Sequence, residues 1–250
     1  YILHADWENT RTLLSQAKTP ELLALLGEAE LGLSHREAAL AAFDRALAAA
    51  PDLAAARKGR TAALLSLGRS DGFGPGSDFS GAEARKLTLS GLDLSGSNFT
   101  FGDFSEIIAE GAKLDRADFR RAHFRDLRAA KASLRDADFR HAEVSYVDLS
   151  QADLRGASFR WAHLLRVRFL GADLTGADFT AAKLEEADFS GATLTGAALS
   201  GVQRTASRLA GVDLSGQALV GASPLSGHAA ARGGSDRCSV GRRQPRRGAV

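Results

Sequence analysis

The sequence predicts a mainly β protein: a square coil of short extended segments over residues 77–222, preceded by a helical segment at 1–69. Three observations support this. From Phe79 to Leu219, every fifth residue is Leu, Phe or Val at 25 of 29 positions, although these types form under a quarter of the chain. Identical apolar residues also recur every twenty positions. The apolar spacing typical of helices is confined to the first 69 residues.

Residues 1–69 carry the start and stop signals of short helices. Thr19-Pro20 predicts a helix start, because Pro is favoured at the first helical position. Ser34–Glu37 matches a capping box, which predicts a helix that Pro51 ends. Asp52 is expected to open the next helix, over Leu53–Leu67.

These helices resemble tetratricopeptide repeats. The residues on the signature positions are Leu23, Leu26, Gly27, Ala39, Phe43, Ala46 and Pro51. Glu30 stands where that pattern has an aromatic residue, and residues 5–17 resemble the end of an earlier repeat. Such arrays need about three stacked units, and the chain does not begin with Met. The resemblance therefore implies the C-terminal end of a longer array in a longer protein.

The Gly-rich segment 70–76 joins the helices to the repeat region, where a five-residue period fits neither a helix nor a long strand. It fits two extended steps followed by a corner, with the residues two apart pointing inward. Four corners close a coil of twenty residues, and columns of identical residues then stack. The expected core columns are Phe99, Phe119, Phe139, Phe159 and Phe179, and Leu94, Leu114, Leu134, Leu154, Leu174 and Leu194.

Triplets such as Ala152-Asp153-Leu154 and Ala177-Asp178-Phe179 resemble the pentapeptide-repeat family over residues 77–222. The resemblance implies a right-handed quadrilateral β-helix whose coils stack through parallel backbone hydrogen bonds. At about 4.8 Å per coil, about seven coils form a rod roughly 34 Å long. Residues 223–250 contain six Arg and one Asp without a period, and we expect a disordered tail.

The sequence predicts no enzyme and no catalytic, cofactor-binding or metal-binding residues. Outward side chains on four flat faces diverge, whereas catalysis needs groups that converge in a pocket. His123, Glu143 and His163 share one column, but two coils separate the histidines by about 9.6 Å. Zinc–nitrogen bonds are about 2.0–2.1 Å, so a hydrogen-bonded His–Glu–His ladder is expected instead.

Charged residues also form columns at a spacing of twenty. Alternation of sign predicts a structural ion-pair ladder of Arg128, Asp148, Arg168, Asp188 and Arg208. The candidate protein-contact surface is a basic stripe with an exposed Trp, made of Arg120, Arg121, Arg140, His141, Arg160 and Trp161. The alternative is that these arginines extend into water while Trp161 covers their stems.

The favoured function is a non-enzymatic scaffold or adaptor that binds protein partners. The resemblance leaves a second hypothesis, a DNA mimic that binds type II topoisomerases, but residues 77–222 carry a net charge of only −2. A third hypothesis is the regulatory C-terminal part of a larger enzyme. We expect a cytoplasmic protein without a membrane span or cofactor. Nucleic acid is expected to bind at most weakly, through the Arg-rich tail, and the oligomeric state stays open.

Overall fold

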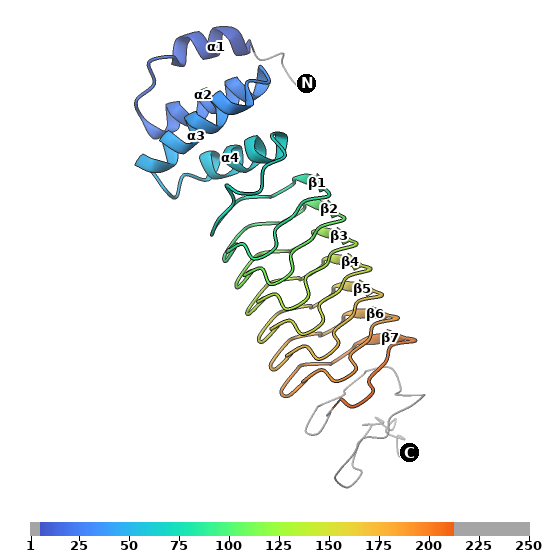
Figure 1. Ribbon diagram of the computed structural model, residues 1–250. Helices are drawn as coiled ribbons and strands as arrows, with labels where there is room; N and C mark the ends of the chain where they lie inside the picture. Colours follow the sequence, from blue (N-terminus) through green and yellow to red (C-terminus); the bar gives the residue numbers. More distant parts are fainter. Residues whose placement is uncertain (1–5, 213–250) are drawn as a thin grey trace, which may run out of the picture.

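The computed structural model describes residues 6–212 as four helices followed by a parallel β-solenoid (Figure 1). The helices are α1 (Trp7–Leu14), α2 (Pro20–Gly32), α3 (Arg36–Ala49) and α4 (Ala54–Ser66). The strands are β1 (Glu83–Arg85), β2 (Asp103–Ser105), β3 (His123–Arg125), β4 (Glu143–Ser145), β5 (His163–Leu165), β6 (Lys183–Glu185) and β7 (Gln203–Thr205). The expected tail at 223–250 lies outside the described residues.

The helices pack around one aromatic side chain. Phe43 of α3 is fully buried, and its ring lies against Gly27 of α2 and Gly59 of α4. A Cβ at either glycine would overlap the ring, so the absence of a side chain permits this close approach. Within residues 6–212, no helix is long and apolar enough to cross a bilayer.

The predicted start of α2 is confirmed, whereas Asp52 does not cap α4. Thr19 accepts a hydrogen bond from the Leu22 N–H at 3.4 Å, and Pro20 is the first helical residue. The N-cap residue of α4 is Leu53, which makes no side-chain capping bond. The Asp52 carboxylate instead pairs with the Arg57 guanidinium at 2.5 Å.

The predicted capping box at Ser34–Glu37 is wrong. Ser34 adopts a left-handed φ of 63° and forms the end of α2, where the His35 N–H donates to the Glu30 carbonyl at 2.8 Å. His35 is the N-cap of α3, without a side-chain capping bond. Its Nδ1 lies 2.9 Å from the Glu30 carboxylate. The short link between the helices therefore uses Ser34 as a turn residue, and its hydroxyl does not cap α3.

The seven strands form one parallel sheet in chain order, with neighbours paired at a spacing of twenty residues, as in Glu83↔Asp103. Backbone N–H groups donate to carbonyls nineteen residues further on, for example Phe99 to Asp118 at 2.7 Å. Left-handed residues recur every five positions and mark the corners. The square coil and the twenty-residue register are thus as the sequence predicts, and Figure 1 shows the coils stacked into a rod.

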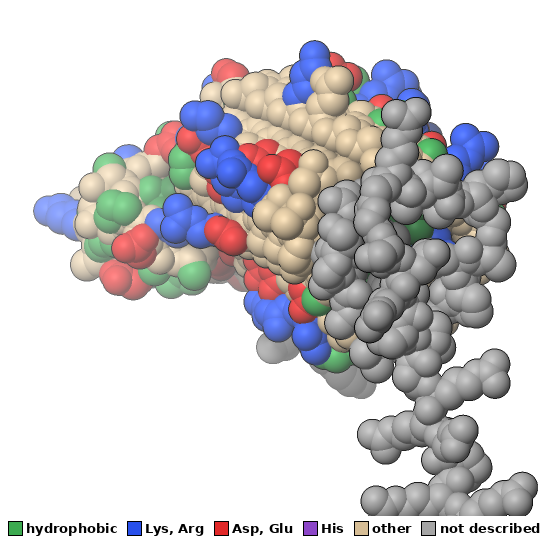
Figure 2. Space-filling model, turned by 90° about the horizontal axis from the view of Figure 1, so that it is seen from below, with side chains coloured by type: hydrophobic (Ala, Val, Ile, Leu, Met, Phe, Trp, Pro, Cys, Tyr) green, Lys and Arg blue, Asp and Glu red, His purple; other side chains and the backbone are tan. Residues whose placement is uncertain are grey.

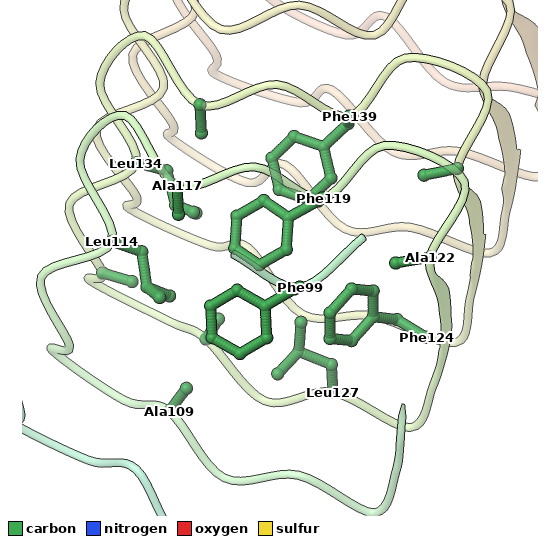
Figure 3. Packing of buried hydrophobic residues seen from close by; sticks show 14 of the residues in the cluster. Phe99, Ala109, Leu114, Ala117, Phe119, Ala122, Phe124, Leu127, Leu134 and Phe139 are labelled. Carbon is green, nitrogen blue, oxygen red and sulfur yellow. The ribbon is translucent and has the colours of Figure 1, made fainter. Parts of the chain in front are cut away.

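A stack of phenylalanine rings runs through the core (Figure 3). The rings lie nearly parallel, with centroids 4.4–4.9 Å apart from each coil to the next. The stacked residues are Phe79, Phe99, Phe119, Phe139, Phe159 and Phe179. The leucine column from Leu94 to Leu194 is buried beside them. These contacts remove two large side chains per coil from water, which is the main stabilising term of such a fold.

The other inward columns compensate for each other in volume. In the second and third coils, Phe104 and Phe124 meet the ring stack edge to face. In later coils Phe169 meets the ring stack edge to face instead. It belongs to the column in which earlier coils have Ala109. Leu164 then occupies the position of the earlier phenylalanines. Close packing requires a nearly constant volume in each layer, so a ring on one side excludes a ring on the other.

The first coil is closed by the segment that follows α4. Phe73 is buried and its ring centroid lies 4.8 Å from that of Phe79, at the start of the ring stack. Arg60 of α4 donates to the Gly72 carbonyl at 2.5 Å. The apolar core therefore continues from the helices into the solenoid, and this end is not an open sheet edge.

The alternating charge column forms separate pairs and not the continuous ladder that we expected. Arg168 lies 3.9 Å from Asp148, and Arg208 lies 3.9 Å from Asp188. Among the described residues, no ion pair joins Arg128 to Asp148. Asp148 also accepts hydrogen bonds from the side chain and N–H of Ser150. Exposed pairs of this kind stabilise by at most about 1 kcal/mol each.

The ring stack generates a stability prediction. Phe139→Ala removes a ring that contacts Phe119 at 4.4 Å and Phe159 at 4.8 Å. We expect the free energy of unfolding to fall by about 3–5 kcal/mol. Arg140→Ala, which removes an exposed ion pair with Asp138, should lower it by about 1 kcal/mol or less. Chemical denaturation measures both, and equal losses would contradict the inward placement of Phe139.

A second prediction concerns pH. Hydrogen bonds from the Arg155 guanidinium, and then from Arg135, lower the pKa of Asp153 from 3.8 to about 2. A carboxylate whose pKa is depressed in the folded state stabilises it above pH 3.8, and loses that effect as pH falls toward 2. The melting temperature of Asp153→Asn should therefore lie below that of the parent at neutral pH. That difference should narrow across this window, and a constant difference would contradict the assignment.

Candidate protein-contact surface

The predicted contact residues lie along one corner of the solenoid, beside the strand face. We call Phe101, Arg121, His141 and Trp161 the contact ridge; they occupy the same corner on four successive coils. Arg120, Arg140 and Arg160, each one residue earlier, form the adjacent arginine column. The structure thus brings all six predicted residues together and adds Phe101.

The four ridge residues adopt a left-handed backbone conformation, with φ of 56–60°. A non-glycine residue in this region costs about 1 kcal/mol or more. At the same corner, the first coil has Gly81 and the last has Gly201. The next corner, from Lys86 to Ala206, has no Gly on any described coil, but most of its side chains are charged and need no apolar partner. The ridge therefore presents the rings of Phe101, His141 and Trp161 at a corner where other coils have Gly.

Ring contacts order the ridge. The His141 and Trp161 rings stack with centroids 5.0 Å apart and planes 11° apart. The Arg121 guanidinium carbon lies 5.6 Å from the centre of the Phe101 ring. Phe101 is nevertheless 65% exposed and Trp161 48% exposed. A ring in this state offers apolar surface and a fixed shape, which are typical of residues that anchor protein interfaces.

Each arginine of the adjacent column is paired with a carboxylate. Arg120 binds Asp118 at 2.6 Å, and Arg140 binds Asp138 at the same distance. Partial burial opposes ionisation of Asp138, yet the hydrogen bonds from Arg140 outweigh it and hold the pKa of that carboxyl below its usual range. Figure 2 shows Lys and Arg side chains beside Asp and Glu on the surface in view. Mixed charge favours specific contacts over attraction to any acidic surface.

Arg160 is held differently from the two arginines before it. Its Nη1 donates to Asp178 on the next coil at 3.0 Å, and its guanidinium carbon lies 4.6 Å from the centre of the Trp161 ring. Burial raises and hydrogen bonds from Thr180 and Arg160 lower the pKa of Asp178, with a net shift below its ordinary value. Asp178 therefore stays ionised and fixes the guanidinium beside the ring.

The predicted His–Glu–His ladder is wrong. The His163 Nε2 atom lies 3.1 Å from the Glu185 carboxylate on the next coil. In the described part of the chain, Glu143 makes no hydrogen bond to His123 or His163. Residues 6–212 also contain no group of three His, Cys, Asp or Glu residues that is placed to hold a metal. A small core void of about 20 Å³ is lined only by apolar side chains and offers no polar group for chemistry.

Sequence reasoning missed two exposed aromatic residues. Phe101 has no charged neighbour in the sequence, but its spacing of twenty from Arg121 would have identified it as part of the ridge. Tyr146 lies on the next corner and is 43% exposed. Its hydroxyl accepts a hydrogen bond from Arg166 at 3.2 Å, and the Arg166 guanidinium lies over its ring at 5.3 Å. Tyr146 therefore differs from the ridge rings in that the arginine over it also binds its hydroxyl group.

The repeat geometry has counterparts among known proteins. The trypsin-treated form of QnrB1, a plasmid-mediated fluoroquinolone resistance protein, is 22% identical, and the match covers 58% of this chain and 83% of that chain with a TM-score of 0.48. HetL, a protein involved in heterocyst differentiation regulation from the cyanobacterium Nostoc sp. strain PCC 7120, is 22% identical. That match covers 58% and 88% of the two chains, with a TM-score of 0.36.

A pentapeptide repeat protein of the Arabidopsis thaliana thylakoid lumen is 34% identical over 41% of this chain and 65% of that chain, with a TM-score of 0.27. Among curated proteins, none matches. The family described as "Pentapeptide repeats" matches in eight copies, at residues 75–100, 103–140, 132–169 and 172–203. Residues 1–74 lie outside that match, so the tetratricopeptide resemblance stays a prediction. With its repeats matched along half of the chain, this protein belongs to the pentapeptide-repeat family.

Proposed function

We propose that the protein is a non-enzymatic scaffold, and that its contact ridge binds a protein partner. The observation that carries this proposal is the exposure of Phe101 and Trp161 at left-handed corners where Gly81 and Gly201 show that Gly suffices. Burying two such rings in an interface gains about 25 cal/mol for each Å² of apolar surface removed from water. The ridge is already ordered by ring contacts, so little side-chain freedom is lost on binding.

The geometry favours binding over catalysis. Outward residues of one face lie on a flat surface, with neighbours one coil apart, and point away from the rod. Reacting groups must instead converge where water is excluded. In this role residues 77–212 act as a rigid rod, Phe73 after α4 covers its first coil, and the helices α1 to α4 offer a second surface for attachment.

The ridge does not support a DNA mimic. Such a mimic presents rows of carboxylates to a basic groove, whereas Asp118 and Asp138 are each bound by an arginine. The span 77–222 has 18 basic and 20 acidic residues, which is close to neutral. An attraction strong enough to compete with DNA needs a field of one sign.

Site-specific photo-crosslinking in the cells that make the protein tests the proposal. A benzoylphenylalanine at position 101 or 161 should crosslink to the same protein partner, because both positions lie on the ridge. Gln151 supplies a matched control, since it is exposed, has a similar φ of 58°, and lies two corners on from His141. Crosslinks to the same protein from position 151, or no crosslink from 101 and 161, would contradict the proposal.

A stability control accompanies the crosslinking. Trp161→Gly should leave the melting temperature unchanged or raise it. Gly adopts the left-handed conformation freely, so the substitution removes a backbone strain of about 1 kcal/mol. If this variant no longer crosslinks from position 101, the loss of partner cannot be attributed to unfolding. A large drop in melting temperature would show that Trp161 serves the fold.

A further inference from the structure

Arginines on the outer faces of the solenoid follow a simple pairing rule. At three places an Asp that pairs with the neighbouring coils stands two residues before an Arg, and the guanidinium binds that carboxylate through two parallel hydrogen bonds. Nε donates to Oδ1 at 2.8–2.9 Å and Nη2 donates to Oδ2 at 2.6–2.7 Å. The pairs are Arg120–Asp118, Arg140–Asp138 and Arg155–Asp153. This fork is the strongest geometry available between the two groups.

Arg160 is an exception to that rule, because the residue two positions earlier is Ser158. Arg160 uses only Nη1, toward Asp178 at 3.0 Å. Within the described residues, its Nε and Nη2 make no hydrogen bond to a side chain or to the backbone. The edge that holds a carboxylate in Arg120 and Arg140 is therefore open on this coil. The short side chain of Ser158 leaves the space that an Asp occupies there.

The open edge is held beside an exposed ring. Asp178 fixes one side of the guanidinium, and the Trp161 ring lies 4.6 Å from its central carbon. His141 stacks on Trp161 and limits the movement of the indole. An arginine whose plane is fixed in this way loses little freedom when its open edge binds a ligand. A ligand that fits has a carboxylate and an apolar group next to it.

We propose that Arg160 and Trp161 form a carboxylate-binding site, which takes an Asp or Glu side chain of a partner peptide. The carboxylate accepts from Nε and Nη2 of Arg160, and an adjacent apolar side chain packs on Trp161. This proposal rests on the proposed function and names the chemistry of the partner. A nucleic acid fits less well, because a stacked base needs a whole free ring face, whereas His141 stacks on Trp161 and the Arg160 guanidinium also lies over that ring.

The probe is an acetylated and amidated peptide, Gly-Glu-Phe-Gly, and its Gln analogue. The readout is the indole N–H resonance of Trp161, with the second Trp, Trp7, as an internal control. We expect the Glu peptide to shift the Trp161 signal and leave that of Trp7 unchanged. The Gln peptide should bind at least about tenfold more weakly, because a charge-assisted pair is replaced by a neutral one.

Ser158→Asp is the decisive variant, because it supplies Arg160 with the carboxylate that the earlier coils have. It should keep the melting temperature of the parent or raise it, while its affinity for the Glu peptide falls at least about tenfold. Arg160→Gln should lower the affinity for the Glu peptide by a similar factor. Arg155→Gln is the matched control and should change the affinity less than about twofold, since Asp153 already occupies its edge.

Three results would overturn the proposal: unchanged binding by Ser158→Asp, equal binding of the Glu and Gln peptides, or no Trp161 shift at about 10 mM peptide. A shift produced by an oligonucleotide and not by the Glu peptide would assign the site to nucleic acid. Failure here is distinct from failure of the scaffold role. If positions 101 and 161 crosslink to a protein while Ser158→Asp has no effect, the ridge binds its partner without this carboxylate site.

Discussion

The structure depends on one constraint: each coil of twenty residues must fill the same interior volume as the coils above and below it. Backbone N–H groups bond to carbonyls nineteen residues away, as Phe119 does to Asp138 at 2.8 Å, and this spacing places like residues over like. The phenylalanine stack is the result, with rings 4.4–4.9 Å apart. Because close packing leaves no spare volume, a substituted inward residue disturbs the layers that it contacts. An insertion that is not a multiple of twenty residues shifts the register of every later layer.

The same constraint decides where function can reside. Inward positions are occupied by the core and the backbone is occupied by coil-to-coil hydrogen bonds, so only outward side chains are free to vary. They form columns whose members lie about 4.8 Å apart, and a change at one position alters the pairing of its neighbours. Ser158 illustrates this: by replacing an Asp, it turns Arg160 toward the next coil and the Trp161 ring. A binding surface on such a rod is therefore a local departure from a repeated pairing pattern.

The sequence predicts the coil because its five-residue period continues without an insertion. The columns then follow, since four such units make one coil of twenty residues. Side-chain pairing is less predictable, because an outward group reaches either two residues along the chain or one coil away. His163 thus meets Glu185 and not Glu143. The capping box failed for a related reason: the turn that links two helices needs a left-handed residue at Ser34. Phe101 was missed because the amino-acid composition does not indicate which apolar residues are exposed.

Two deletions test the central constraint most directly. Removing residues 133–152 deletes one whole coil and joins Ala132 to Asp153-Leu154, so the phenylalanine and leucine columns both stay in register. Removing residues 133–137 keeps the five-residue period but moves Phe139 onto the leucine column above Leu114. For the first deletion we expect a cooperative melt near that of the parent. For the second we expect a melting temperature well below that of the parent, because the ring stack is broken. Equal stability of the two proteins would contradict the requirement for constant volume in each layer.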